Sequence, residues 1–378
     1  MKFIVESQLL LKNLQSVGRI LSPNKFMPIV AENILYEVED NKLTLVGTDL
    51  ETTMVAQFEL SESVGNGKVV IPYKIIAETL KTFPEVRFTF NISEQNEIEM
   101  LAGDAIYNFV GLPADEFPTL PKLENATSFN MPTKVLVDAI KKTIYATGQP
   151  DARPIMTGVL CELKPEYVTF VGTDGRCLAR YRNNKIQTGL DCSFVLPKKP
   201  ISTIKEIFST LDGDVRIDFS NDSVAFTIDG MYVFSKLIEG KYPNYEAVIP
   251  ANNKNIMEVE RLPLMQNLSS LAPFTNQLTH QIRFKITPKE LTLAAEDKDL
   301  SLKKGKVVLP CSFEMENEET DMFEIGFSSK ILQEILKNLD TNTIIFKFSN
   351  PTAAGLILPS ETETDEDILV LAMPVMLG

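Results

Sequence analysis

Three stretches of the chain alternate apolar and polar residues and then end in a short polar turn. They are Leu43–Glu51 (LTLVGTDLE), Val168–Arg176 (VTFVGTDGR) and, with weaker identity, Leu291–Asp299 (LTLAAEDKD). Such alternation predicts a half-buried strand, and the Gly-Thr-Asp sequence predicts a turn. The copies lie roughly one third of the chain apart, which is far longer than the period of a solenoid repeat. The pattern therefore predicts three repeated domains.

The same order of elements surrounds each of these stretches. Each copy has an amphipathic helix, strands that lead through the polar turn, a second helix and three closing strands. We expect two helices and about eight strands per copy, an α+β class with helices on one face of antiparallel sheet. The expected domains are 1–126, 127–250 and 251–378. The expected helices are 7–21, 73–83, 132–146, 198–211, 261–274 and 328–339.

Bulk composition is typical of a globular protein, with 44% apolar and 23% charged residues in a chain of 378. No apolar run is long enough to span a bilayer, and the N-terminus lacks the pattern of a secretory signal. We therefore expect a cytoplasmic protein with no membrane partner. The four cysteines are too dispersed for a zinc site and are expected to be reduced thiols. His280 is the only histidine, and we interpret it as a solvated or hydrogen-bonded side chain.

Charge is distributed unevenly between the expected helices and the rest of the chain. The formal net charge is −14, yet the six helices hold 13 basic and 4 acidic residues. Solvated helices usually mix both signs, so this excess indicates a positive surface within an acidic protein. Such a surface suits the phosphate backbone of a nucleic acid. Chance and the good helix propensity of lysine are the alternative explanation. The basic residues are not interleaved with aromatic ones, which favours contact without base reading.

The sequence contains no recognisable catalytic constellation. A serine elbow and the glycine loops that bind nucleotide phosphates are absent. We interpret Gly65–Lys68 as a hairpin turn, and Asp49 and Asp174 as side chains that cap their own turns. We interpret the acidic run Glu361–Asp367 as a solvated hairpin tip. We expect no catalytic residue, no metal and no cofactor.

Several motifs together resemble the beta sliding clamp family, the beta subunit of bacterial DNA polymerase III. They are MKFIVE at the start, LTLVGTDLE, LPADEF followed by FPTLP, the second TDG, SKLIEGKYPNY, FEIGF and the terminal MPV. The resemblance covers the whole chain. It implies a head-to-tail homodimeric ring, a non-catalytic processivity factor that encircles duplex DNA without sequence specificity. It also implies that DNA polymerase III subunits, a clamp loader and other clamp-binding peptides are partners in DNA replication.

The resemblance further implies a hydrophobic pocket for partner peptides between the second and third domains. This chain departs from the family pattern at Arg176-Cys177, at Ala247 beside Glu246 and at the terminal MPVMLG, so the peptide preference stays open. By position, the pocket residues are Met156, Thr173, Gly175, Arg176, Leu178, Pro243, Val248, Leu371, Met373, Pro374, Val375 and Met376. Without the resemblance, these residues would be interpreted as ordinary core.

Two further sets of residues follow from the basic helices and from the resemblance. The dimer contact is expected to join the edge strand Ala105–Gly111, through Tyr107 and Phe109, to the third domain near Pro273 and Phe274. The DNA-facing residues are expected to be Lys12, Arg19, Asn24, Lys25, Lys74, Lys81, Lys134, Lys141, Lys142, Gln149, Arg153, Lys198, Lys199, Lys205, Lys330 and Lys337.

Two other hypotheses remain open at the level of sequence. One is a ring-shaped scaffold for protein interactions that has no DNA-tethering role, and processive synthesis after reversal of the helix lysines would favour it. The other is an enzyme built on three repeated domains, and turnover that depends on Asp49 or Asp174 would favour it.

Overall fold

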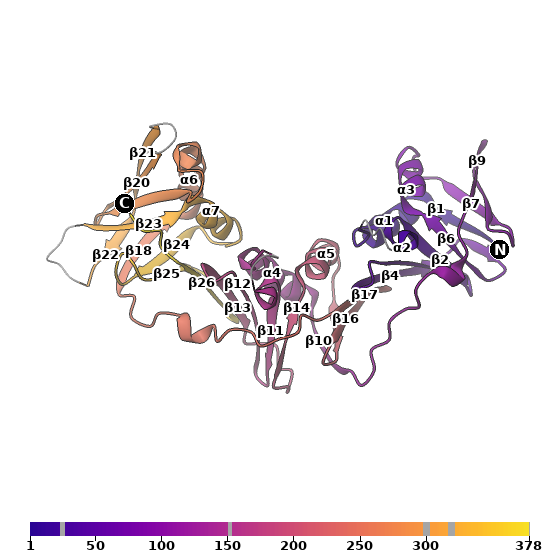
Figure 1. Cartoon of the computed structure of the whole chain (residues 1–378), viewed down its shortest axis with the longest axis horizontal. Coiled ribbons are helices and arrows are strands. Elements are labelled where there is room, and N and C mark those ends of the chain that lie inside the picture. Colours follow the sequence, from indigo (N-terminus) through magenta and orange to yellow (C-terminus); the bar gives the residue numbers. More distant parts are fainter. Residues whose placement is uncertain (23–26, 150–152, 298–302, 317–321, 378) are drawn as a thin grey trace. The chain divides into compact units, whose positions relative to one another are not determined.

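The computed structural model describes residues 1–22, 27–149, 153–297, 303–316 and 322–377. The chain divides into two compact units. Unit 1 comprises Met1–Val137 and Lys199–Leu237, and unit 2 comprises Asp138–Lys198 and Ile238–Gly378. Each unit contains two antiparallel sheets together with helices, so the predicted α+β class is confirmed (Figure 1). The domain boundaries near residues 126 and 250 stay a prediction.

Unit 1 contains a five-stranded sheet in the order β5-β1-β7-β8-β9 and an eight-stranded sheet in the order β10-β15-β16-β17-β4-β3-β2-β6. The larger sheet is continuous because β17 pairs antiparallel with β4. The strands are β1 (Lys2–Glu6), β2 (Asn33–Glu39), β3 (Lys42–Thr48), β4 (Thr52–Glu59), β5 (Glu62–Val64), β6 (Gly67–Pro72), β7 (Arg87–Ile92), β8 (Glu97–Ala102), β9 (Ala105–Val110), β10 (Thr127–Pro132), β15 (Asp214–Phe219), β16 (Ser223–Ile228) and β17 (Met231–Lys236).

Unit 2 contains a nine-stranded sheet in the order β14-β11-β12-β13-β26-β25-β24-β18-β22 and a four-stranded sheet in the order β21-β20-β19-β23. Here β13 pairs antiparallel with β26, as β4 pairs with β17 in unit 1. The strands are β11 (Val159–Lys164), β12 (Tyr167–Thr173), β13 (Cys177–Asn183), β14 (Cys192–Leu196), β18 (Asn255–Glu260), β19 (Gln281–Ile286), β20 (Glu290–Asp297), β21 (Lys303–Pro310), β22 (Ser312–Glu314), β23 (Phe323–Ser328), β24 (Thr343–Phe348), β25 (Gly355–Pro359) and β26 (Glu366–Ala372).

The six predicted helices are present, with shorter α-helical parts than expected. The first ends at Gly18 rather than at residue 21. In unit 1, α1 packs beside α3 and buries Leu10, Leu14 and Val17, and in unit 2 α6 packs beside α7 (Figure 1). The α-helices are α1 (Ser7–Gly18), α2 (Pro28–Ala31), α3 (Tyr73–Lys81), α4 (Thr133–Thr143), α5 (Lys198–Phe208), α6 (Arg261–Leu271) and α7 (Ser329–Lys337), and the short 3-10 helices are η1 (Ala114–Glu116), η2 (Ile144–Ala146), η3 (Pro154–Thr157), η4 (Glu246–Val248) and η5 (Ala272–Phe274).

The repeated Gly-Thr-Asp turn is built in the same way in both units. The Asp49 carboxylate accepts backbone N–H bonds from Glu51 (3.1 Å) and Thr52 (2.7 Å). Asp174 accepts the two equivalent bonds, at 2.8 and 2.7 Å. The residue after each aspartate is left-handed, with φ 78° at Leu50 and 86° at Gly175, a conformation that glycine adopts at least cost. The prediction that both aspartates cap their turns is confirmed.

One local expectation was wrong, and a second was right only in part. Gly65–Lys68 is not a hairpin turn, because β5 before it pairs with β1 and β6 after it pairs with β2 in a different sheet. The acidic run at 361–367 was expected to be a solvated hairpin tip, and residues 361–364 are exposed in the connection between the antiparallel strands β25 and β26. The end of the run is less solvated, because the Glu366 side chain is only 9% exposed and Asp367 pairs with Arg180 at 2.5 Å. All four cysteines are free thiols, buried or half-buried, as expected.

Candidate nucleic-acid and partner-binding sites

One apolar cluster in unit 2 contains several of the expected pocket residues. Leu178 on β13 and Leu371 on β26 are buried in it, at 2% and 4% exposure. The segment after β17 covers this cluster with Tyr242 and Tyr245. The Tyr242 hydroxyl donates to the carbonyl of Val171 at 3.2 Å, which fixes the segment to the sheet. Side chains from neighbouring strands and from the covering segment thus form one continuous apolar cluster.

Three large apolar side chains that are close in sequence to residues of this cluster remain exposed. Val248 is 57% exposed, Met373 is 44% exposed and Met376 is 70% exposed. Clusters of exposed apolar groups next to buried ones are typical of protein-binding surfaces. The tail that supplies the two methionines is held to the unit by backbone bonds of 2.8 Å, from Met373 to Arg176 and from Val375 to Gly326. The exposed methionines therefore sit on an anchored segment.

The remaining expected pocket residues take different positions. Met156 and Thr173 are buried, and Pro243, Pro374 and Val375 are half-buried. A Cβ built on Gly175 would lie 3.7 Å from Met156 Cε, so these two residues are neighbours. Sequence reasoning missed the covering tyrosines, although the aromatic residue before Pro243 was visible as part of a repeated aromatic-proline pair. It also missed the cluster members Leu160, Val171, Val195, Leu356 and Leu369.

Charged and polar groups lie next to the covering segment. The Tyr245 hydroxyl donates to Glu162 at 2.9 Å, and Arg182 lies 3.5 Å from Glu246 on η4. Burial and the carboxylate of Glu162 raise the pKa of Tyr245, so it remains a neutral donor. Arg176 is exposed, and in the described ranges it has no ion-pair partner. The arrangement offers one free guanidinium beside an apolar surface.

Most of the expected DNA-facing lysines are exposed. Within the described ranges, six of them have no ion-pair partner: Lys205, which is half-buried, and the exposed Lys12, Lys81, Lys198, Lys330 and Lys337. Lys134, Gln149 and Arg153 are also exposed. Asn24 and Lys25 lie outside the described residues.

Four of the expected cations are engaged by acidic groups. Lys141 pairs with Asp340 at 2.9 Å, and Lys74 approaches Glu78 at 4.0 Å. Arg19 pairs with Glu206, so that α1 and α5 are linked in unit 1. Lys199 donates to the Asp49 carboxylate and to the carbonyl of Ile20, just after α1. These four residues remain partly exposed, but part of their charge is neutralised within the chain.

Lys142 was expected to face DNA, and this expectation was wrong. Its side chain is 7% exposed and lies 3.0 Å from the Glu366 carboxylate, which is itself 9% exposed. The Tyr181 hydroxyl donates to the other oxygen of Glu366 at 2.6 Å, and the Lys142 ammonium lies 5.1 Å from the tyrosine ring. On α4, Lys142 therefore faces the sheet, whereas its neighbour Lys141 remains partly exposed.

The expected dimer residues lie on an edge strand, β9, or on the short helix η5. β9 is the last strand of the five-stranded sheet, and Tyr107 and Phe109 are half-buried on it. β21 is likewise the last strand of the four-stranded sheet, in unit 2. Close to β21, Pro273 is exposed and Phe274 is 37% exposed. Unpaired edges of this kind are open to another strand.

Two classes of site receive no support from the geometry. No group of acidic, histidine and cysteine side chains with the arrangement of a metal site occurs within the described ranges. In the same residues, no helix is sufficiently long and apolar to cross a membrane.

The repeated sheets, the helices that carry the exposed lysines and the apolar surface define a clamp fold of three α+β domains. Comparison with known proteins identifies the same class. Models of the DNA polymerase III beta subunit match the N-terminal domain at residues 1–121, the central domain at 130–244 and the C-terminal domain at 246–376. The chain belongs to the DNA polymerase III beta subunit family, the beta sliding clamps.

Individual relatives agree along the full length. The beta sliding clamp of Haemophilus influenzae is 27% identical over 380 residues, with complete coverage of both chains. That of Chlamydia pneumoniae is 26% identical over 383 residues and covers 100% of this chain and 99% of the relative. Among solved structures, the Pseudomonas aeruginosa clamp bound to griselimycin superposes with a TM-score of 0.92 at 25% identity, with both chains fully covered.

Proposed function

We propose that two copies of this chain close head to tail into a ring that encircles duplex DNA. As a member of its family, the chain is a non-catalytic processivity subunit and is associated with DNA polymerase III in replication. The ring would tether the polymerase by topology, so weak contacts with DNA suffice and sliding stays free. We place this activity in the cytoplasm. We also propose that the chain forms three domains, at residues 1–126, 127–250 and 251–378.

The observation that carries the proposal is the repeated pairing of strand edges. β17 pairs with β4 in unit 1, and β26 pairs with β13 in unit 2. The corresponding strands at the two ends of the series, β9 and β21, have an unpaired edge. A second copy supplies the missing partner for β9 and for β21, so every strand edge of this type is paired in a ring of two chains. Closed symmetry of this kind is the rule for homo-oligomers.

The exposed lysines on the helices support contact with DNA. Ammonium groups that touch only phosphate position a duplex without reading its sequence. Loss of this interaction with rising salt is the general signature of phosphate contacts. In this proposal the DNA-facing set keeps the exposed residues and loses Lys142. It includes Lys141, Lys199, Arg19 and Lys74 only as partly neutralised groups.

The apolar surface around Leu178 and Leu371 supports a site for partner peptides. We propose that the apolar side chains of a polymerase or clamp-loader peptide bind against Val248 and Met373. The buried cluster below would supply a firm floor, and anchors seated on such floors dominate binding energy. Arg176 would favour a peptide that carries an acidic residue beside its apolar anchors.

The test combines native mass with retention on plasmid DNA after loading. We expect a dimer of twice the 42.3 kDa chain mass. After loading, the ring should stay on circular plasmid in high salt and slide off the linearised plasmid. Purely electrostatic binding would fall with salt on both forms. A monomer, or equal loss from circular and linear DNA, would contradict the ring.

A further inference from the structure

The apolar cluster below the proposed peptide site has a counterpart in unit 1. Residues of the two clusters correspond at the spacing that separates Thr48 from Thr173, and in each unit three come from strands and one from the segment that follows the strands. The corresponding residues are Leu35 and Leu160, Val46 and Val171, Val70 and Val195, and Phe117 and Tyr242. All eight are buried. The internal repeat therefore builds this type of apolar floor twice.

The backbone beside each cluster is also built in the same way. In unit 2 the N–H of Met373 donates to the carbonyl of Arg176 at 2.8 Å, and in unit 1 the N–H of Lys236 donates to the carbonyl of Glu51 at 3.0 Å. Each acceptor is the second residue after the aspartate that caps the Gly-Thr-Asp turn. Glu51 and Lys236 therefore occupy in unit 1 the positions that Arg176 and Met373 occupy in unit 2.

The side chains at these equivalent positions differ in character. Lys236 Nζ lies 3.2 Å from a carboxylate oxygen of Glu51, and the two side chains are 55% and 68% exposed. An exposed pair of this kind contributes little to stability. An apolar group that binds over it must remove water from both charges, which is costly unless new hydrogen bonds replace that water. The main effect of the pair is therefore on what can bind there.

Leu50 occupies in unit 1 the position that Gly175 occupies in unit 2. Its φ of 78° is a conformation that glycine adopts without strain and that leucine does not. A Cβ on Gly175 would lie 3.7 Å from Cε of the pocket residue Met156, so a side chain at this position extends beside the pocket. Unit 1 has the half-buried Ala31 at the position of Met156. A leucine on the turn thus adds bulk at the place where unit 2 is open.

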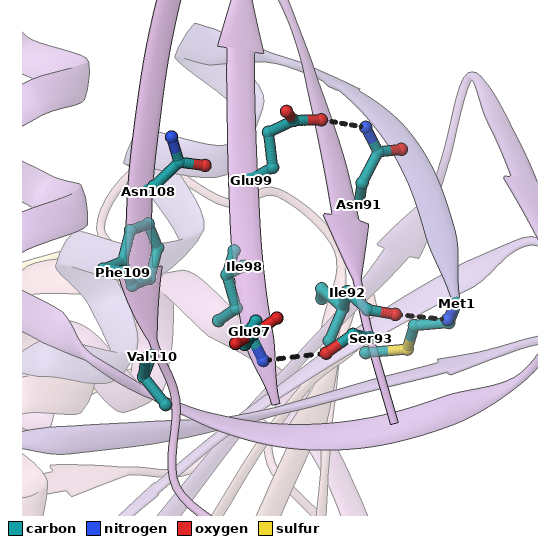
Figure 2. Close-up of a pocket in the computed structure, with 10 residues that line it drawn as sticks. All are labelled: Met1, Asn91, Ile92, Ser93, Glu97, Ile98, Glu99, Asn108, Phe109 and Val110. Carbon is teal, nitrogen blue, oxygen red and sulfur yellow. Dashed lines mark hydrogen bonds between the residues drawn. The ribbon is translucent and has the colours of Figure 1, made fainter. Parts of the chain in front are cut away.

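A hollow elsewhere in unit 1 differs from both clusters. It holds about 700 Å³ beside β8 and β9, and Glu97, Glu99 and Phe109 are among its lining residues (Figure 2). The Glu99 carboxylate accepts a 2.8 Å bond from the amide of Asn91. Carboxylates in the lining repel the acidic residue of the peptide proposed for unit 2. A second peptide of that kind would therefore bind at the unit 1 cluster and not in this hollow.

We propose that Leu50, Glu51 and Lys236 exclude partner peptides from unit 1 and thereby limit each chain to one peptide site. The inference rests on the proposed peptide site in unit 2 and adds the residues that prevent its duplication. Features that oppose an unwanted complex determine specificity as much as features that favour the correct one. Partner proteins would then exchange at a single site on each chain.

Exchange of these three residues for those of unit 2 tests the proposal. The full-length variant Leu50→Gly, Glu51→Arg and Lys236→Met is titrated with a fluorescent synthetic peptide that has two leucine anchors beside an aspartate. We expect one bound peptide per wild-type chain and two per variant chain. The second site should be roughly tenfold weaker, because Thr53 at the position of Leu178 offers less apolar surface. One peptide per chain of a folded variant would overturn the proposal.

Two controls locate the new site and separate it from a general effect of charge. Leu123 corresponds to Val248, so adding Leu123→Ala to the triple variant should weaken only the second site, by about tenfold; an unchanged second site would contradict the assignment. Lys42→Met with Glu59→Arg removes a comparable ion pair of 3.6 Å from the far end of β3 and β4. This control should still bind one peptide per chain, and a second peptide would overturn the proposal.

A milder variant decides the question if the triple variant does not fold. Glu51→Gln with Lys236→Met removes both charges and leaves Leu50 and the capping aspartate in place. This variant should also gain a second site, and its absence in a folded chain would overturn the role of the ion pair. A wild-type chain that binds no peptide would instead refute the proposed peptide site in unit 2.

Discussion

Replacement of Lys142 by methionine tests the burial of the ion pair that links α4 to β26. The ammonium of Lys142 and the carboxylate of Glu366 are each at least nine-tenths buried, and the Tyr181 hydroxyl also binds that carboxylate. Methionine keeps the length and apolar stem of the side chain but removes the charge. Glu366 would then be left as a buried carboxylate with the tyrosine as its remaining donor.

The expected loss is large because an unpaired buried charge keeps its desolvation cost. Breaking a buried pair by removing one partner costs about 3–5 kcal/mol. Lys141→Met is the matched control, since it removes one positive charge from the adjacent position of the same helix. Lys141 and Asp340 are 37% and 60% exposed, and exposed pairs contribute about 0–1 kcal/mol. The double variant Lys142→Met with Glu366→Leu should recover much of the loss.

Amide hydrogen exchange of β13 and β26 is the appropriate assay, because it reports opening of this sheet without requiring the whole chain to unfold in one step. A loss of 3–5 kcal/mol corresponds to exchange faster by about two to four powers of ten. Lys141→Met should change the same amides by less than about tenfold. Equal, small effects of the two substitutions would show that Lys142 is not buried, and the reasoning would fail.

Three further predictions concern the surface. Replacement of three exposed helix lysines by glutamate, at Lys12, Lys81 and Lys198, should reduce the steepness of the plot of log affinity for DNA against log salt by about three. The same replacement at three exposed lysines outside the helices, Lys122, Lys241 and Lys289, should leave the slope unchanged. Met373→Ala with Val248→Ala should weaken a polymerase peptide by about tenfold in a binding titration while native mass still reports a dimer; unchanged affinity would exclude this site. Burial raises the pKa of the Cys311 thiol to about 11. Because the native state holds this proton more tightly than the unfolded state, the thiol contributes to the free energy of unfolding at neutral pH. That contribution is lost as the pH rises toward 11. Alkylation of native Cys311 should therefore be slow near pH 8 and accelerate toward pH 11, and equal rates in native and urea-unfolded protein at about pH 8 would contradict this.

The repeated turn could be predicted from sequence because its structure is local. Asp49 and Asp174 bind N–H groups two and three residues further along the chain, so the residue types alone determine the conformation. The helices were predictable for a similar reason, since a buried stripe such as Leu10, Leu14 and Val17 is a property of one segment. The floor of the proposed peptide site was different. Leu178 and Leu371 were expected there only through the family resemblance, because they come from strands that only the sheet brings together.

The basic character of the helices could be predicted from the sequence, but the environment of Lys142 could not. Lys141 and Lys142 are adjacent in sequence and point in different directions around α4, one partly exposed and one toward Glu366. The sequence shows the lysines of a helix but not the acidic group that faces each of them across another element. The acidic run near Glu366 was misjudged for the same reason, because its burial depends on a lysine more than two hundred residues away.

One edge strand, β21, was hard to predict, whereas the edge strand β9 was expected at Ala105–Gly111. β21 was not expected as a strand because its first residues, Lys303 to Lys306, lack an apolar face. Such a sequence is unusual inside a sheet but common at an edge, where charge discourages unwanted pairing.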